Sequence, residues 1–147
     1  MYKHFLIPTD GSELSHRAIE SGVAFAATLG AKVTFLYAQP EYPLPLVGEG
    51  VMLTPDSREE FAAGTEDQAQ RILAGAMEIA GTAKVTAQTK TRACDSPYAL
   101  IIETAEKEGC DLVFMASHGR RGLAGLILGS ETSKVLTHCK IPVLVYR

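Results

Sequence analysis

The sequence has 147 residues, of which 46% are hydrophobic, so it is long enough to bury one full core. Its formal charge of −3 gives no excess of basic residues, which argues against nucleic acid as a main partner. No apolar run approaches the roughly 20 residues that a membrane-spanning helix needs. We therefore expect no partnership with nucleic acid or with a membrane.

The start of the chain and its cysteines favour a cytoplasmic location. The opening MYKHFLIPTDGS lacks the long apolar core and the small-residue cleavage site of a signal peptide. Cys94, Cys110 and Cys139 lie far apart and form no CxxC pair, so neither a disulfide framework nor a zinc site is expected. We interpret all three as buried, inert free thiols in a reducing compartment.

Strand-like and helix-like segments alternate in the first half of the chain. A short strand is expected at Phe5–Ile7, and a helix at Ser12–Gly30, where apolar residues recur every three or four positions. A second strand at Lys32–Ala38 is rich in β-branched and aromatic residues. Gln39–Gly50 carries three prolines and two glycines, so it is expected to be an irregular loop, either a functional lid or a surface excursion.

The second half of the chain repeats the alternation. A helix from about Asp56 to Ala80 is followed by Lys84–Thr91, whose alternating lysines are typical of an edge strand. Ser96 should cap a helix that begins at Pro97 and ends at Gly109. The remaining elements are a strand at Leu112–Met115, a helix at Ser130–Cys139 and a strand at Pro142–Tyr146. In that last helix, the residues expected to face inward are Thr132, Val135, Leu136 and Cys139.

This alternation predicts an α/β fold with a single domain over residues 1–147. Helices of this length between strands imply a three-layer α/β/α, Rossmann-like arrangement around a five-stranded parallel sheet, for which we expect the order 3-2-1-4-5. In such sheets, ligands bind beyond the carboxyl ends of the strands, where the strand order reverses. Two loops should meet there, Thr9–Ser12 after the first strand and Ala116–Thr132 after the fourth.

The Ala116–Thr132 segment has the composition of a phosphate-binding loop. It lies between a strand and a helix and contains four glycines and two adjacent arginines: Gly119, Gly122, Gly125, Gly129, Arg120 and Arg121. Glycine lets the backbone approach an anion closely, and the free N–H groups and dipole of a helix start attract negative charge. The segment therefore favours binding of a nucleotide phosphate.

Several candidate residues have a second interpretation. Asp10 could accept from a ligand or cap the first helix, and Arg120 and Arg121 could bind phosphate or point into solvent. His118 has no Asp or Glu in the sequence placed to orient it as a base, so we expect ligand contact rather than catalysis. Glu131 complements the helix dipole but repels phosphate, which a bridging Mg²⁺ would relieve.

The motifs of the common nucleotide-dependent enzymes are missing. The sequence contains no GxxxxGK[ST], no GxGxxG after the first strand and no GxSxG. We therefore expect no catalytic residue and no protein metal site. Binding is favoured, and at most a weak ATPase activity is expected.

The order of these features matches a known family. The chain resembles the universal stress protein family over nearly its whole length, in KHFLIPTDGSELSHRAIE and in SHGRRGLAGLILGSETSKVLTHCKIPVLV. ATP-binding members carry Gly-x-x-Gly, nine residues, and then Gly-Ser or Gly-Thr. Gly119, the nine residues Arg120–Leu128 and Gly129–Ser130 match the second part of this pattern, and Ala116 stands at its first glycine.

The resemblance implies an adenine nucleotide alpha hydrolase-like fold that binds ATP, with or without Mg²⁺. Asp10, with Pro8 and Thr9, would line the adenosine pocket, and the backbone of Ala38 would recognise the adenine base. The residues implied to flank the ribose and the phosphates are Met115, Ala116, His118 and Gly119, with Arg120 beside them. Those implied to offer N–H groups and hydroxyls to the phosphates are Gly129, Ser130, Glu131 and Thr132.

The resemblance also implies a homodimer through the last strand, Ile141–Arg147. Independently, an apolar strand at a sheet edge is an aggregation hazard that a symmetric partner would cover. The expected function is an ATP-binding stress-response regulator with an unidentified protein partner. Two alternatives remain, a slow ATPase or nucleotidyl-transfer enzyme and a nucleotide-free dimeric interaction protein.

Overall fold

The structure is a computed structural model that describes residues 1–43, 55–120, 122 and 127–147. Its strands are β1 (His4–Thr9), β2 (Lys32–Pro40), β3 (Ala87–Cys94), β4 (Leu112–Ala116) and β5 (Val143–Tyr146). Its helices are α1 (Glu13–Leu29), α2 (Pro55–Thr82), α3 (Pro97–Lys107) and α4 (Ser130–His138). The strands form one parallel sheet in the order β3-β2-β1-β4-β5, which confirms the predicted α/β class and strand order.

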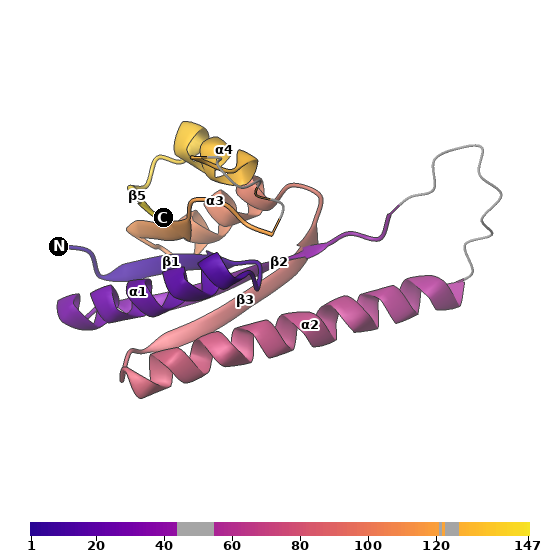
Figure 1. Ribbon diagram of the computed structural model, residues 1–147, viewed down its shortest axis with the longest axis horizontal. Helices are drawn as coiled ribbons and strands as arrows, with labels where there is room; N and C mark the ends of the chain where they lie inside the picture. The colour runs from indigo at the N-terminus through magenta and orange to yellow at the C-terminus, as the bar shows by residue number, and fades with distance from the viewer. Residues whose placement is uncertain (44–54, 121, 123–126) are drawn as a thin grey trace.

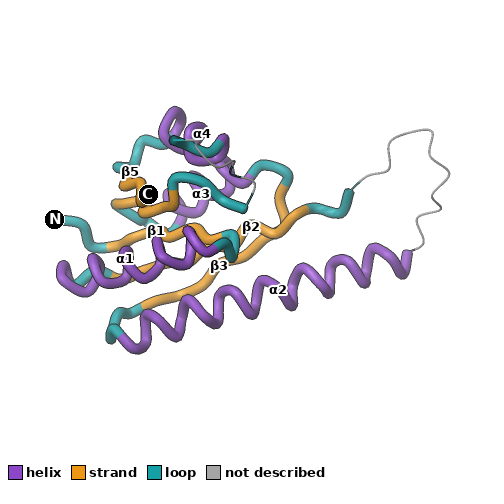
Figure 2. The backbone as a smooth tube through the Cα atoms, in the orientation of Figure 1, coloured by secondary structure: helices purple, strands orange, loops and turns teal. Residues whose placement is uncertain are grey.

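The sheet lies between two layers of helices. Helices α1 and α2 cover one face, and α3 and α4 cover the other (Figure 1, Figure 2). Because side chains alternate along a strand, Phe5 and Ile7 pack toward α1 and α2, and Leu6 packs toward α3. All three are fully buried. A strand covered on both faces therefore appears in the sequence as a continuous apolar run.

Local signals fix the ends of α1 as predicted. The Oγ of Ser12 accepts the N–H of Ser15 at 3.2 Å, which caps the first turn. At the other end, Gly30 has a φ of 65° and donates its N–H to the last carbonyls of the helix. At the start of α3, Pro97 occupies the first turn as predicted, but the Ser96 side chain makes no capping bond.

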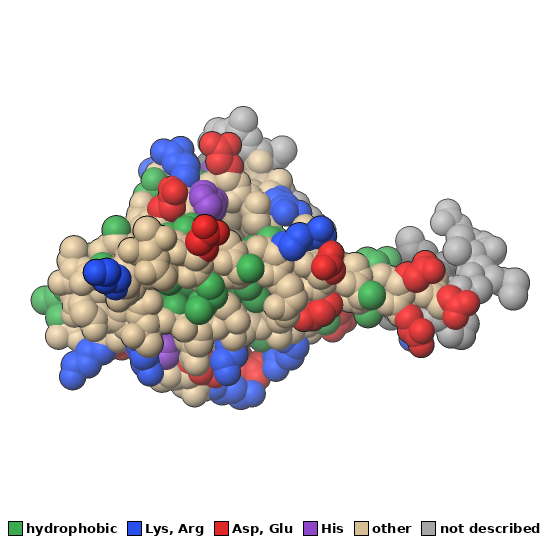
Figure 3. Space-filling view, turned by 90° about the horizontal axis from the view of Figure 1, so that it is seen from below, with side chains coloured by type: hydrophobic (Ala, Val, Ile, Leu, Met, Phe, Trp, Pro, Cys, Tyr) green, Lys and Arg blue, Asp and Glu red, His purple; other side chains and the backbone are tan. Residues whose placement is uncertain are grey.

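Helix α2 is 28 residues long and projects past the end of the sheet (Figure 1). The apolar side chains buried against the sheet, Ala69, Leu73, Ala76 and Ala80, come from its carboxyl-terminal half. Near its amino-terminal end, Tyr42 packs edge-on against Phe61 with ring centroids 5.3 Å apart. Exposed acidic side chains gather on this projecting part (Figure 3), among them Asp56, Glu59 and Glu60.

Three details of the sequence prediction change. Strand β2 continues to Pro40, so the first residues of Gln39–Gly50 are regular, and residues 44–50 lie outside the described part of the chain. Strand β3 begins at Ala87 because Lys84, with a φ of 58°, belongs to the turn before it. Its edge position is confirmed. On α4, Leu136 is 42% exposed, so the prediction that it faces inward is wrong.

The cysteines and the helices bear on two further expectations. Cys94, Cys110 and Cys139 are all free thiols, but only Cys110 is buried; Cys94 and Cys139 are half-buried, so the prediction of burial is wrong for these two. Burial, with a smaller contribution from Glu108, raises the pKa of Cys110 to about 12, so this thiol is unreactive in the folded protein. Across the described residues, none of the helices combines the length and the apolar character needed to cross a bilayer.

Candidate functional site

Two loops far apart in the sequence meet at the carboxyl edge of the sheet. Asp10 follows β1, and its Oδ2 accepts the backbone N–H of Arg120, beyond β4, at 2.7 Å. Its Oδ1 accepts the N–H of Ser12 at 2.9 Å. Burial alone would raise the pKa of Asp10, but hydrogen bonds from Ser12, Arg120 and Ser15 outweigh it and lower the pKa. Asp10 is therefore a fixed carboxylate that joins the two loops, whereas Ser12 caps the helix.

The candidate residues at the strand ends divide between the two faces of the sheet. Met115 is buried in the core on the α3 and α4 side, and Ala38 packs against the same core. Strand alternation places Pro8 on that side as well. Ala116 belongs to the core on the α1 and α2 side. Its methyl group therefore points away from the surface that Met115 and Ala38 form.

Thr9 faces α1 and takes part in the turn that follows β1. Its Oγ1 lies 3.0 Å from the Oγ of Ser15 and accepts the N–H of Gly11 at 3.2 Å. Gly11 has a φ of 76°, and a Cβ there would lie 2.7 Å from Ile72 Cδ1 and 2.8 Å from a guanidinium nitrogen of Arg120. The positive φ favours glycine at this position, because residues with a side chain rarely adopt it, whereas the nearby atoms are the ends of flexible side chains.

Close packing within the loop after β4 also explains its glycines. A Cβ on Gly119 would overlap the Oδ2 of Asp10, and a Cβ on Gly122 would overlap the ring of His118. A Cβ on Gly129 would lie 3.1 Å from the Cα of His118. The loop is therefore folded against itself and against Asp10. Arg121 and Gly125, which the sequence also singles out, lie outside the described residues.

Several backbone N–H groups of this loop already have acceptors. Gly129 donates to the carbonyl of Ser117 at 2.7 Å, and Gly122 donates to the carbonyl of Gly119 at 2.9 Å. The Arg120 N–H is bonded to Asp10, as described above. These bonds shape the loop and leave those three groups unavailable to a ligand without rearrangement.

Helix α4 begins at the end of this loop without a side-chain cap. Its N-cap is Gly129, so no side-chain oxygen bonds to the first turn. The N–H groups of Ser130, Glu131 and Thr132 belong to that turn and have no acceptor within the helix. The Oγ1 of buried Thr132 donates to the carbonyl of Ala116 at 3.0 Å, which ties α4 to the end of β4. The first turn is thus held in place, and its N–H groups have no acceptor among the residues that the structure describes.

The side chain of Glu131 turns toward α3. Its Oε2 accepts the N–H of Tyr98, in the first turn of α3, at 2.7 Å, and its Oε1 lies 3.2 Å from Nζ of Lys134. The Glu131 carboxylate therefore caps the first turn of α3, a role that was expected of the Ser96 side chain. No sequence signal pairs these two helices, and reasoning from the sequence missed Tyr98.

His118 lies beside the loop glycines, half-buried. Its Nδ1 is 3.2 Å from the Oγ of Ser117. The partner of this nitrogen is thus a hydroxyl and not the carboxylate that usually orients a catalytic histidine. Among the residues that the structure describes, no group of three His, Cys, Asp or Glu side chains is arranged to hold a metal ion.

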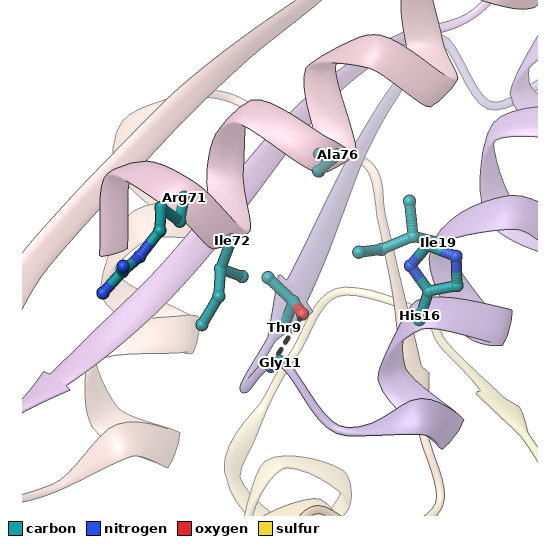
Figure 4. A pocket seen from close by; sticks show the side chains of 8 residues that line it. Thr9, Gly11, His16, Ile19, Arg71, Ile72 and Ala76 are labelled. Atoms are coloured by element: carbon teal, nitrogen blue, oxygen red, sulfur yellow. Dashed lines mark hydrogen bonds between the residues drawn. The ribbon is translucent and has the colours of Figure 1, made fainter. Parts of the chain in front are cut away.

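A separate cavity of about 200 Å³ lies between α1 and α2 (Figure 4). Thr9 and Gly11 lie at its base, and Ile19 of α1 and Ile72 and Ala76 of α2 form apolar walls (Figure 4). Among the described residues, its lining includes none from the loop after β4 or from α4.

The fold agrees with comparisons to known proteins. The model of the Universal stress protein family matches residues 1–147. The chain belongs to the universal stress protein family. This confirms the resemblance that the sequence motifs indicated.

Individual family members extend this comparison. Universal stress protein MJ0531 of Methanocaldococcus jannaschii is 30% identical over 100% of this chain and 83% of its own length. The solved structure of MJ0577, from the same organism, is 27% identical and has a TM-score of 0.83, covering 99% of this chain and 95% of that one. A solved universal stress protein in complex with cAMP is 25% identical, with a TM-score of 0.71 and coverage of 99% and 97%.

Proposed function

We propose that the chain acts as a single adenine-nucleotide-binding domain with a regulatory role, and that its ligand is ATP. The observation that carries this proposal is the junction of the Asp10 carboxylate with the loop that leads into the uncapped start of α4. A ribose acceptor and a phosphate-binding helix start lie together at the edge where open α/β sheets bind ligands. The cAMP complex of a similar protein supports the same ligand class.

The described residues fit such a ligand in three parts. The half-buried Pro8 and Ala38, beside the buried Met115, offer an apolar surface for the base on the α3 and α4 side of the sheet. The carboxylate of Asp10 would accept from the ribose, because each of its oxygens has a second lone pair beside its present bond. The N–H groups at the start of α4 would receive phosphate oxygens.

Any Mg²⁺ that accompanies ATP would be held by the phosphate oxygens in this proposal. Glu131 is the acidic residue nearest the helix start, but its two oxygens are bonded to Tyr98 and Lys134. The Nδ1 of His118 has a hydroxyl as its neighbour and not a carboxylate, so we expect the site to bind ATP rather than to hydrolyse it. ATP would regulate the protein by binding one conformation of the loop after β4 more tightly than another.

Isothermal titration with ATP, with and without Mg²⁺, tests this proposal. Asp10→Ala should weaken binding at the ribose, and Gly129→Val should weaken it by disturbing the start of α4, each by about tenfold or more. Glu60→Gln, on the projecting part of α2, is a control that should bind as wild type does. No binding by the wild-type protein below millimolar ATP would refute the proposal. Native mass spectrometry of the purified protein should show co-purified nucleotide.

We also propose that the protein is a homodimer through Ile141–Arg147. Strand β5 pairs with β4 alone in the sheet order, and its residues Val143–Tyr146 are half-buried. The exposed Leu136 of neighbouring α4 is an apolar side chain that a partner would cover. Light scattering after size exclusion should show a dimer at micromolar concentration and a monomer for Leu136→Lys combined with Val145→Lys. A wild-type monomer would refute the dimer.

A further inference from the structure

The charge of Glu131 has a consequence for ligand choice. We propose that Glu131 is a specificity-determining residue that weakens the binding of adenine nucleotides in proportion to the charge of their phosphate chain. This inference rests on the proposed function, since it places the phosphates at the start of α4. It predicts that Glu131 lowers affinity for ATP more than for AMP.

The carboxylate is held close to the proposed phosphate position. Glu131 is the second residue of α4, so its backbone N–H is one of the proposed phosphate donors. Consecutive residues of a helix rise about 1.5 Å along its axis, so the Glu131 side chain starts beside these donors. A negative side chain near the helix start repels a phosphate bound there, even in a partly aqueous site.

Glu131 cannot swing away from this position without losing its partners on α3. Its carboxylate is bonded to the N–H of Tyr98 at 2.7 Å and to Lys134 at 3.2 Å. The ring of Tyr98 in turn lies 5.4 Å from Nζ of Lys134 and 5.6 Å from the ring of His138. The bond from the Tyr98 N–H fixes the Glu131 carboxylate between α3 and α4, and Lys134 forms a partly exposed ion pair with it.

Some N–H groups of the loop after β4 are already bonded within the protein, namely those of Arg120, Gly122 and Gly129. The proposed function places the phosphates at the first turn of α4, which includes Glu131. The ionised Asp10 is bonded to the loop that leads into α4. A triphosphate carries more charge than a monophosphate and meets more repulsion from these carboxylates.

The experiment measures dissociation constants of AMP, ADP and ATP for the wild-type protein and for Glu131→Gln. Glutamine keeps an oxygen that accepts the Tyr98 N–H, so the link between α3 and α4 survives and only the charge is removed. We expect affinity for ATP to rise about three- to tenfold, with a gain of less than about twofold for AMP and an intermediate gain for ADP. Raising the salt concentration should reduce the gain for ATP, because ions screen it.

Glu106→Gln is the matched control, since it removes the same charge from an exposed position on α3. It should change all three affinities by less than about twofold. Equal shifts for AMP and ATP in Glu131→Gln, or weaker binding of both, would mean that Glu131 only supports the structure and would overturn the inference. Failure of wild-type protein to bind any of the three nucleotides would instead refute the proposed function and this inference with it.

Discussion

The carboxylate of Asp10 accepts the backbone N–H of Arg120 at 2.7 Å, across 110 positions of the sequence. This bond joins the loop that follows β1, the central strand of the parallel sheet, to the loop that follows the neighbouring strand β4. Gly119 lies so close to the carboxylate that any side chain there would overlap it. Contacts of the protein itself therefore hold the two loops together before a ligand binds, which reduces the ordering cost of binding.

Asp10→Asn should destabilise the protein at neutral pH. The substitution keeps the shape but removes a charge that accepts two backbone N–H groups, so we expect a loss of about 1–2 kcal/mol in the free energy of unfolding. Urea denaturation measures this loss. Asp67→Asn is the control, because Asp67 forms an exposed ion pair with Arg71 and should cost little.

The same variant has a defined pH dependence. The pKa of Asp10 is lowered in the folded state, so its contribution to stability is present above its unfolded pKa of about 3.9. The contribution is lost as the pH falls through the folded-state pKa. The difference between wild type and Asp10→Asn should therefore shrink in acid. A difference that stayed constant from pH 7 to pH 3 would contradict the assigned role of the charge.

The sequence predicted the architecture because the dominant signals are periodic. The run Phe5–Ile7 is buried on both faces of the sheet, and the helix ends carry Ser12 and Gly30 at the expected positions. The convergence of the Asp10 loop with the loop after β4 follows from the strand order alone. These features depend on local chemistry and on general rules of topology.

Contacts between elements left no periodic signal. The hydrogen bond from the Tyr98 N–H to Glu131 joins two helices through residues 33 positions apart. Neither residue type indicates the other as its partner. Strand β3 begins later than the sequence predicted because Lys84 adopts a left-handed conformation, which non-glycine residues rarely do. Leu136 has the helical spacing of the buried residues of α4, but its side chain is exposed.

Thr132→Val should loosen α4 from the end of β4. Valine has nearly the same shape, but it cannot donate to the carbonyl of Ala116, which would lose its bond from Thr132 Oγ1. Because Thr132 is buried, we expect a loss of about 1–2 kcal/mol in the free energy of unfolding. Thr137→Val removes a similar bond at an exposed position of the same helix and should cost less. Equal losses in both variants would contradict a special role for Thr132.

Two glycine-to-alanine substitutions should have opposite effects on stability. A Cβ at Gly22 of α1 would lie 2.7 Å from Ile7 Cδ1 and 3.0 Å from a ring carbon of Phe114, so Gly22→Ala should cost about 1–3 kcal/mol. A Cβ at Gly64 of α2 meets nothing within 4 Å, so Gly64→Ala should add about 0.5–1 kcal/mol through helix propensity. Thermal denaturation of the two variants distinguishes these effects. The same sign of change in both would contradict the packing of α1 on the sheet.

Protonation of buried His4 should destabilise the protein in mild acid. His4 is 4% exposed, and its Nε2 lies 2.8 Å from Thr34 Oγ1. Burial, with a contribution from Lys32, lowers the pKa of His4, although the carboxylates of Asp111 and Glu108 oppose the shift. The folded state therefore favours the neutral ring.

The sign of the pH effect follows from this lowered pKa. The stabilising contribution of neutral His4 is fully present above its unfolded pKa of about 6.5 and decreases as the pH falls below that value, because the unfolded chain then binds the proton more readily. Free energies of unfolding at pH 7.5 and pH 5.5 should show a drop in the wild type that is smaller in His4→Gln. His16 is exposed, so His16→Gln should retain the wild-type drop. An undiminished drop in His4→Gln would show that another group is responsible.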